Sequence, residues 1–255
     1  MLEADAAPGR SKRFRAGHLM DARTRPDLPG AAAPRRLETP DPEEAIIEAA
    51  RRFAESCFAG SRGSHAWDHT QRVCRLSERI GRAEGADMAV LCTAALLHDI
   101  GRMAQDESAG VVCHAERGEQ MARPLVRSLA LSPARRENIL HCIRAHRFRG
   151  GQRPRTLEAR VLFDADKLDA IGAVGVARAF LFAGEVGARL HAPEMRPEET
   201  QPYSQNDTGY REFRLKLSRV REHMLTAEGR RLADERHRFM ADFFDRFLAE
   251  YEGAY

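Results

Sequence analysis

Hydrophobic residues along most of this 255-residue chain recur every three or four positions, as on one face of an α-helix. The first such stretch begins at Thr39-Pro-Asp-Pro-Glu-Glu, where capping residues, proline and acids are typical of a helix N-terminus. A second fits 67–82, and a third, 87–100, is apolar on all sides and therefore predicts a central helix. Further helical stretches follow at 114–130, 132–146, 156–170, 173–184, 208–224 and 226–252.

Clusters of glycine, proline and polar residues separate these stretches at 101–113, 147–156 and 185–207, which we expect to be loops. Pro124 falls inside 114–130 and should kink or split that helix, because proline lacks a backbone N–H. No segment alternates between apolar and polar residues with the period of two that a half-buried strand shows. The sequence therefore predicts an all-α fold, and it contains no internal repeat.

The first 40 residues have a different composition, rich in Ala, Pro, Gly and Arg, with no sustained apolar period. Such a segment cannot bury enough apolar surface to offset the entropy of an ordered chain. We therefore expect 1–40 to be a disordered N-terminal extension, and 41–253 to be one folded domain. Arginines in this extension could contact an anionic partner, whereas its acidic residues argue against an organelle-targeting peptide.

The composition of the whole chain is ordinary for a globular protein, with 43% hydrophobic and 31% charged residues and a net charge of +3. No apolar run approaches the 18 or so residues that a membrane span needs, and the N-terminus lacks the apolar core of a secretory signal. The five cysteines are scattered and form no CxxC pair, which indicates a reducing compartment. We expect a cytoplasmic protein without a membrane or nucleic-acid partner.

The pair His98-Asp99 ends the most apolar of the predicted helices, immediately before Ile100-Gly101. Burying a charged carboxylate there is costly unless a partner compensates for the lost hydration. A metal ion compensates well, because it binds both carboxylate oxygen and neutral imidazole nitrogen. The pair therefore predicts a metal site at the end of this helix.

Two other segments carry residues that suit such a site. His65 and His69 are four residues apart, on one face of a predicted helix. Downstream, 164–169 packs three aspartates and Lys167 into an otherwise apolar stretch, which is hard to explain as surface decoration. These segments are the candidate partners of His98 and Asp99.

His69, then His98-Asp99, then Asp166 resemble in their order the H…HD…D signature of the HD superfamily of metal-dependent phosphohydrolases. The segment 225–240 also resembles the C-terminal part of one bacterial branch of small HD hydrolases. Together the resemblance covers about 43–253. It implies an HD-domain helical bundle with additional C-terminal helices.

The resemblance also implies a divalent metal ion (Mn, Mg, Fe, Co or Ni) whose primary ligands are His69, His98, Asp99 and Asp166. Members with two ions recruit further histidines, and His114 and His146 match those positions best. Asp164 and Asp169 are then candidates for orienting ligand histidines or the lysine. Structural roles for Asp164, Asp169 and the two additional histidines remain open alternatives.

The implied reaction is metal-assisted hydrolysis, in which the ion lowers the pKa of a bound water that then attacks phosphorus. Asp99, Lys167 and Asp169 are the candidate catalytic residues. Negative charge that develops on the phosphoryl oxygens requires positive partners. Arg72, which lies next to a ligand in sequence, and the arginine-rich loop residues Arg147 and Arg149 are the candidate substrate-binding residues, although a loop of this kind is often simply solvated.

The expected substrate is a nucleotide or another small phosphorylated compound. One alternative is a di-iron oxygenase of HD type, in which His114 and His146 would supply extra ligands. Another is a nucleotide-sensing protein without catalysis, against which the intact ligand set argues. The sequence is also compatible with a homodimer.

Overall fold

The computed structural model describes residues 41–59, 67–108, 110–147 and 152–254. The predicted N-terminal extension 1–40 lies outside these residues, as do His65 and Arg149. The described residues belong to one compact unit. All regular elements in the described ranges are helical, which confirms the all-α fold.

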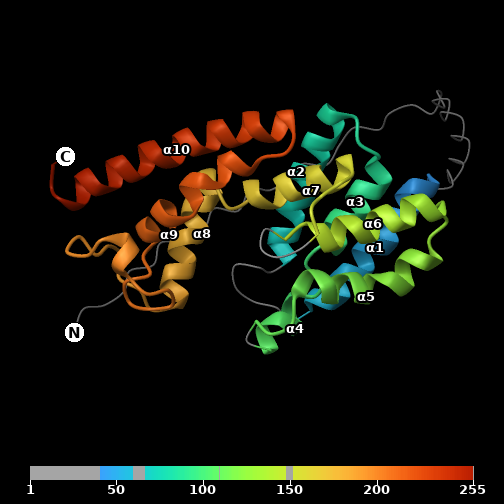
Figure 1. The fold of residues 1–255 in the computed structure, drawn as a ribbon, viewed down its shortest axis with the longest axis horizontal. Coiled ribbons are helices and arrows are strands. Elements are labelled where there is room, and N and C mark those ends of the chain that lie inside the picture. The colour runs from blue at the N-terminus through green and yellow to red at the C-terminus, as the bar shows by residue number, and fades with distance from the viewer. Residues whose placement is uncertain (1–40, 60–66, 109, 148–151, 255) are drawn as a thin grey trace, which may run out of the picture. The chain divides into compact units, whose positions relative to one another are not determined.

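The helices follow the predicted stretches closely (Figure 1). They are α1 (Pro42–Phe58), α2 (Trp67–Glu84), α3 (Met88–Leu97), α4 (Arg102–Glu107), α5 (His114–Ser128), α6 (Pro133–Ala145), α7 (Leu157–Leu168), α8 (Gly172–Glu185), α9 (Gly209–Leu215) and α10 (Ala227–Tyr251), with 3₁₀ turns η1 (Pro197–Glu199) and η2 (Leu217–His223). Six α-helices begin at a side chain that accepts a hydrogen bond from the first turn, which stabilises a helix N-terminus. These capping residues are Asp41, Asp87, Ser132, Thr156, Thr208 and Thr226.

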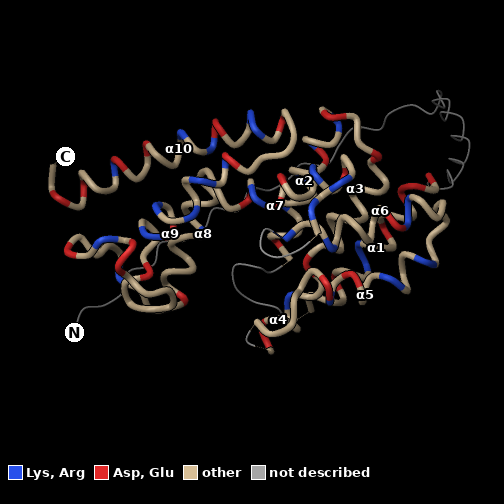
Figure 2. The backbone as a smooth tube through the Cα atoms, viewed as in Figure 1, with Lys and Arg blue, Asp and Glu red and all other residues tan. Residues whose placement is uncertain are grey.

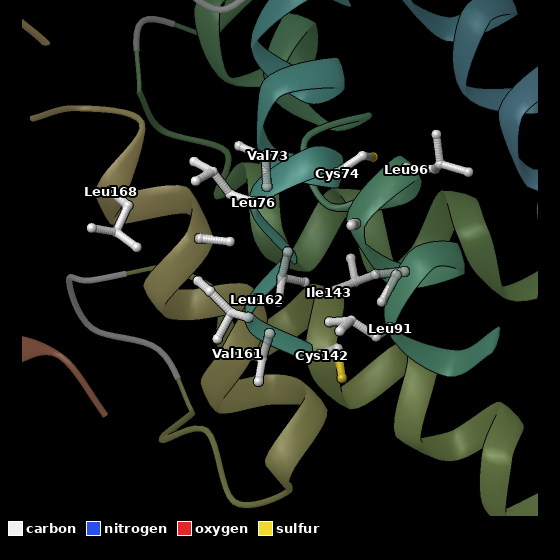
Figure 3. Packing of buried hydrophobic residues seen from close by; sticks show 14 of the residues in the cluster. Val73, Cys74, Leu76, Leu91, Leu96, Cys142, Ile143, Val161, Leu162 and Leu168 are labelled. Atoms are coloured by element: carbon white, nitrogen blue, oxygen red, sulfur yellow. The ribbon is translucent and has the colours of Figure 1, made fainter. Parts of the chain in front are cut away.

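Helix α3 occupies the centre of the core, as its all-round apolar sequence predicts. It contacts α1, α2, α6 and α7, and its residues from Ala89 to Leu97 are all buried. Buried side chains of α2, α3, α6 and α7 meet in one cluster, seen close by in Figure 3. Each large aliphatic side chain that becomes fully buried, such as Leu97, contributes about 1.5–3 kcal/mol to stability. This packing fixes the end of α3, and therefore the positions of His98 and Asp99.

The C-terminal helices are attached to the core through α7. The buried carboxylate of Asp164 accepts hydrogen bonds from the backbone N–H of Leu225 (2.8 Å) and from the N–H (2.8 Å) and hydroxyl (2.6 Å) of Thr226, just before α10. Farther along α10, Arg236 donates to the carbonyl of Leu168 at 2.5 Å. Asp164 therefore has the structural role that the sequence left open, and it anchors α10 to α7.

Two local expectations were wrong, and a third was wrong in one respect. The segment 101–113 contains the short helix α4, which lacks a side-chain cap and is too short to show a period. The predicted helix 208–224 is broken at Lys216, whose φ of −134° is not helical, and it continues as η2. Pro124 does not divide α5, because the burial of Ala122 and Val126 on either side outweighs one lost backbone hydrogen bond.

Charged residues are distributed unevenly over these helices (Figure 2). They are spaced along the whole of α10, whereas α3 carries none between Met88 and Leu97. In the described part of the chain, no helix combines the length and apolar character needed to cross a membrane.

Candidate metal centre

Six side chains that can bind metal converge where several helices end or begin, and they form two sets with ligand atoms within 4.8 Å of one another. We call His69, His98 and Asp166 the first ligand group, and Asp99, His114 and His146 the second ligand group. His69 lies in the first turn of α2 and Asp166 in the last turn of α7. The HD pair directly follows α3, while His114 begins α5 and His146 follows α6. The structure thus brings together all six residues that the resemblance proposed as ligands.

Gly101 allows the turn after α3 to approach α5 closely. A Cβ atom at this position would lie 2.3 Å from the carbonyl oxygen of His114 and 2.6 Å from the backbone nitrogen of Gly118. Any larger residue would push the turn away from α5. The glycine that follows the HD pair is therefore required to bring Asp99 next to His114.

Asp99 lies between the two ligand groups. Its Oδ2 is 3.8 Å from His69 Nε2, and its Oδ1 is 3.5 Å from the Nε2 atoms of both His114 and His146. One carboxylate with its two oxygens directed at different histidines suits a position shared by two metal ions. The arrangement can therefore accommodate one ion or two.

The ring orientation of three histidines is fixed by acceptors on the outer side. The Nδ1 atoms of His98, His114 and His146 donate to Ala95 O (2.8 Å), Gln105 Oε1 (2.7 Å) and Ile143 O (2.6 Å), respectively. Their Nε2 atoms therefore face the centre, and those of His114 and His146 are only 3.1 Å apart. This is the orientation that metal-binding histidines adopt, with the outer N–H held by an acceptor.

His98 provides the test of whether a metal fits. The side chain is completely buried, and its Nε2 has no hydrogen-bond partner. Burial lowers the pKa of His98 to about 4, so at neutral pH this nitrogen carries a lone pair. A buried acceptor without a donor costs about 1–3 kcal/mol, and a divalent cation would satisfy it. The donor set consists of four imidazoles and two carboxylates. It fits a divalent transition-metal ion, because such ions bind imidazole nitrogen as well as carboxylate oxygen.

His69 is oriented by a carboxylate. Its Nδ1 donates to Asp169 Oδ2 at 2.8 Å, and its Nε2 is 3.3 Å from Asp166 Oδ1. Burial alone would lower the pKa of His69, but the hydrogen bonds to Asp166 and Asp169 raise it to about 9. Arg72 Nε (2.7 Å) and Arg178 Nη1 (2.6 Å) donate to Asp169 in turn. The structure therefore places Asp169 behind His69, as an orienting residue.

The predicted cationic residues have protein partners. Lys167 Nζ lies 2.5 Å from Asp166 Oδ2 and donates to the carbonyl of His146 at 3.1 Å. Arg72 also donates to Asp68, at 2.7 Å. Arg147 is half-buried, with its Nη1 3.1 Å from Cys113 Sγ. Arg149 lies outside the described residues.

Three residues at the site were missed from the sequence. Arg102 and Gln105 lie on α4, in the segment 101–113 that the sequence predicts to be a loop. Arg102 contacts Asp99, and Gln105 contacts His114. The spacing of three residues between Asp99 and Arg102, which is typical of neighbours on one helical face, is the sequence signal that could have identified Arg102. Arg178 lies on α8, and no local pattern connects it with Asp169.

Comparisons with known proteins agree with this site. The family model of the HD domain matches residues 66–171, which include all six candidate ligands and the whole of the HD turn. YpgQ of Bacillus subtilis, an uncharacterised protein, is 32% identical over 200 residues, which are 77% of this chain and 89% of YpgQ. The chain belongs to the HD superfamily of hydrolases.

Two solved structures resemble this HD hydrolase over 82% of its length. The crystal structure of B. subtilis YpgQ in complex with ADP is 31% identical, with a TM-score of 0.63 and 96% of that chain covered. An HD-superfamily hydrolase from Bacillus thuringiensis is 25% identical, with a TM-score of 0.66 and 98% covered. HD domains bind divalent metals, and either of the two ligand groups could hold one.

Proposed function

We propose that this HD hydrolase cleaves a phosphate ester or anhydride of a nucleotide or another small compound, and that it requires one or two divalent metal ions. The observation that carries the proposal is His98 Nε2, a fully buried lone pair with no donor, among the other candidate ligands. Most buried polar side-chain atoms have a hydrogen-bond partner, and His98 Nε2 lacks one at a point where other candidate ligands converge. Here the missing partner would be the metal.

The primary ion would be held by His69, His98, Asp99 and Asp166, and a second ion by Asp99, His114 and His146. A bound ion would supply hydroxide near neutral pH, because it lowers the pKa of a coordinated water. Asp169 keeps the Nδ1–H of His69 on the outer side, so that Nε2 faces inward. Lys167 holds Oδ2 of Asp166 and leaves Oδ1 directed at His69.

The substrate proposal rests on charge and on the YpgQ complex. YpgQ was crystallised in complex with ADP, which supports a nucleotide as the ligand of the present protein. We propose Arg72, Arg147 and Arg149 as the residues that bind its phosphates, since guanidinium groups suit phosphate oxygens. Lys167 would neutralise charge next to the metal ligands.

The test is hydrolysis by the purified protein after loading with Mn²⁺, followed as release of phosphate and pyrophosphate from a panel of nucleotides. EDTA should abolish the activity. Asp99→Ala removes the residue shared by both ligand groups and should lower kcat/KM by at least about 10³-fold. Asp106→Asn, an exposed change on α4, is the matched control and should retain activity. Hydrolysis that survives in Asp99→Ala would contradict the proposed site.

A second candidate function is oxygen chemistry at a di-iron centre. It is favoured by one observation, that Asp99 lies between the two ligand groups, which could therefore hold two irons close together. Two equivalents of bound iron with oxygen uptake, and no phosphate release from any nucleotide, would favour this candidate. Binding of ADP without either reaction would favour a nucleotide-sensing protein.

A further inference from the structure

Arg102 is the first residue of α4, and its side chain folds back over the HD turn. Its Nη2 lies 3.1 Å from Oδ1 and 3.2 Å from Oδ2 of Asp99, and 3.4 Å from Nε2 of His114. Oδ1 is also the oxygen nearest to the Nε2 atoms of His114 and His146. The guanidinium therefore contacts the same atoms of two residues that a metal ion in the second ligand group would need.

At the first ligand group, the neighbouring lysine is placed differently. Lys167 binds Asp166 through Oδ2, whereas Oδ1 is the oxygen that faces His69 Nε2 at 3.3 Å. His98 Nε2 has no hydrogen-bond partner at all. Lys167 thus contacts neither Oδ1 of Asp166 nor Nε2 of His98, and Arg102 reaches the ligands of the first ion only through Oδ2 of Asp99.

The charges around the site add to this difference. Three carboxylates, those of Asp99, Asp166 and Asp169, already contact four lysine or arginine side chains, which are Lys167, Arg72, Arg102 and Arg178, as well as the imidazole of His69. A first divalent ion satisfies the open lone pair of His98. A second ion would bring two further positive charges next to Arg102, and like charges at such distances repel.

We propose that Arg102 is a resident counter-cation of the second ligand group, and that a second divalent ion binds there only by displacing its guanidinium. This proposal rests on the metal-dependent function proposed above. The two ions then bind in order, the first tightly and the second weakly. Arg102 sets the metal concentration at which the second ligand group fills.

The test is the binding of Mn²⁺ alone to the full chain, measured by equilibrium dialysis, with EPR to detect pairs of spin-coupled ions. Groups next to metal ligands commonly change metal affinity by about 10- to 100-fold. We expect wild-type protein to bind one Mn²⁺ tightly and a second more weakly by about that factor. Arg102→Gln, which removes the charge, should tighten the second ion by about 10- to 100-fold and change the first ion less, because Arg102 also contacts Asp99 Oδ2.

Two further variants separate the effect of position from that of charge. Arg102→Lys keeps a positive charge at the site, and its second ion should remain weak. Arg117→Gln removes one charge from an exposed position on α5, the helix that begins with His114, and should bind both ions as wild type does. Thermal melting of each metal-free variant checks that it folds, and Arg102→Met replaces Arg102→Gln if that variant does not.

The outcomes distinguish this proposal from the one on which it rests. Wild-type protein that binds no Mn²⁺ would refute the metal-dependent function itself. Wild-type protein that binds two ions equally tightly would refute only the role of Arg102. The same holds if Arg102→Gln binds its second ion no more tightly than wild type, or if Arg117→Gln tightens it to the same extent.

Discussion

The two ligand groups have the same chemical composition, two histidines and one aspartate each, but their surroundings differ. In the first group, the carboxylate of Asp169 accepts the outer N–H of His69. In the second, the corresponding acceptors for His114 and His146 are the neutral oxygens of Gln105 and Ile143. A carboxylate behind a histidine raises its basicity more than a neutral acceptor does. Identical ligands can therefore be tuned to different affinities by the residues behind them.

The difference extends to the cations nearby. Arg72 and Arg178 contact Asp169, which itself binds the outer nitrogen of the ligand His69. The two arginines therefore hold the orienting carboxylate in place. Arg102 instead contacts the ligand Asp99 directly. In the first ligand group, Lys167 contacts Oδ2 of Asp166, whereas Oδ1 faces His69; in the second, Arg102 contacts Oδ1 of Asp99, the oxygen nearest His114 and His146.

The largest expected effect comes from removing the charge behind His69. Asp169→Asn keeps the size of the side chain but loses the carboxylate, which should weaken the first Mn²⁺ by about 10- to 100-fold. The second ion should change much less. Equilibrium dialysis measures both constants, and an unchanged first constant would show that Asp169 does not support this group.

The pH dependence of metal binding should show the same asymmetry. The pKa of His69 is raised to about 9 in the metal-free protein, so below that pH the first ion must displace a proton. Its affinity should fall by about tenfold per pH unit below pH 9. Burial lowers the pKa of His114, so this ligand of the second group needs no deprotonation in the neutral range.

Proton release on adding Mn²⁺ to weakly buffered protein measures this exchange. About one proton per first ion should appear at pH 7, and almost none at pH 10. In the metal-free protein, protonated His69 stabilises the folded state because its pKa is raised on folding. This stabilisation is complete below the ordinary pKa of 6.5 and is lost as the pH rises through about 9. Equal proton release at both pH values would contradict the assignment.

The smallest expected effect is on the neutral acceptor of the second ligand group. Gln105→Ala removes the hydrogen bond to His114 Nδ1 and should weaken the second Mn²⁺ by roughly 2- to 10-fold, the equivalent of about 0.5–1.5 kcal/mol. The first ion should bind as in wild type. A loss as large as that of Asp169→Asn would mean that a neutral acceptor matters as much as a carboxylate, and the comparison of the two groups would fail.

Most of the fold was predictable because helical period and caps are local properties of the sequence. The stretches 67–82 and 87–100, for example, correspond to α2 and to α3 with the HD turn. The errors lie where the local pattern is too short to read or is overridden. Pro124 stays within an unbroken α5 because its neighbours are buried, and Lys216 ends α9 although the apolar period continues.

The candidate ligands were also predictable, because residue type and order in the chain identify them. The side chains behind them were predictable only in part. Asp169 was named as an orienting candidate, but so was Asp164, which anchors α10 instead. Nothing in a local pattern distinguishes these two carboxylates, since the difference depends on which distant segment each one meets.

By itself, the sequence determined the helices and the residues that can bind metal, because both follow from residue types at short, regular spacings. Only the tertiary structure decided which cation contacts which carboxylate. Arg72 and Arg178 meet Asp169, and Arg102 meets Asp99, because packing brings the ends of separate helices together at one point. Since ion binding depends on charges within a few ångströms, the balance between the two ligand groups exists only in the folded chain.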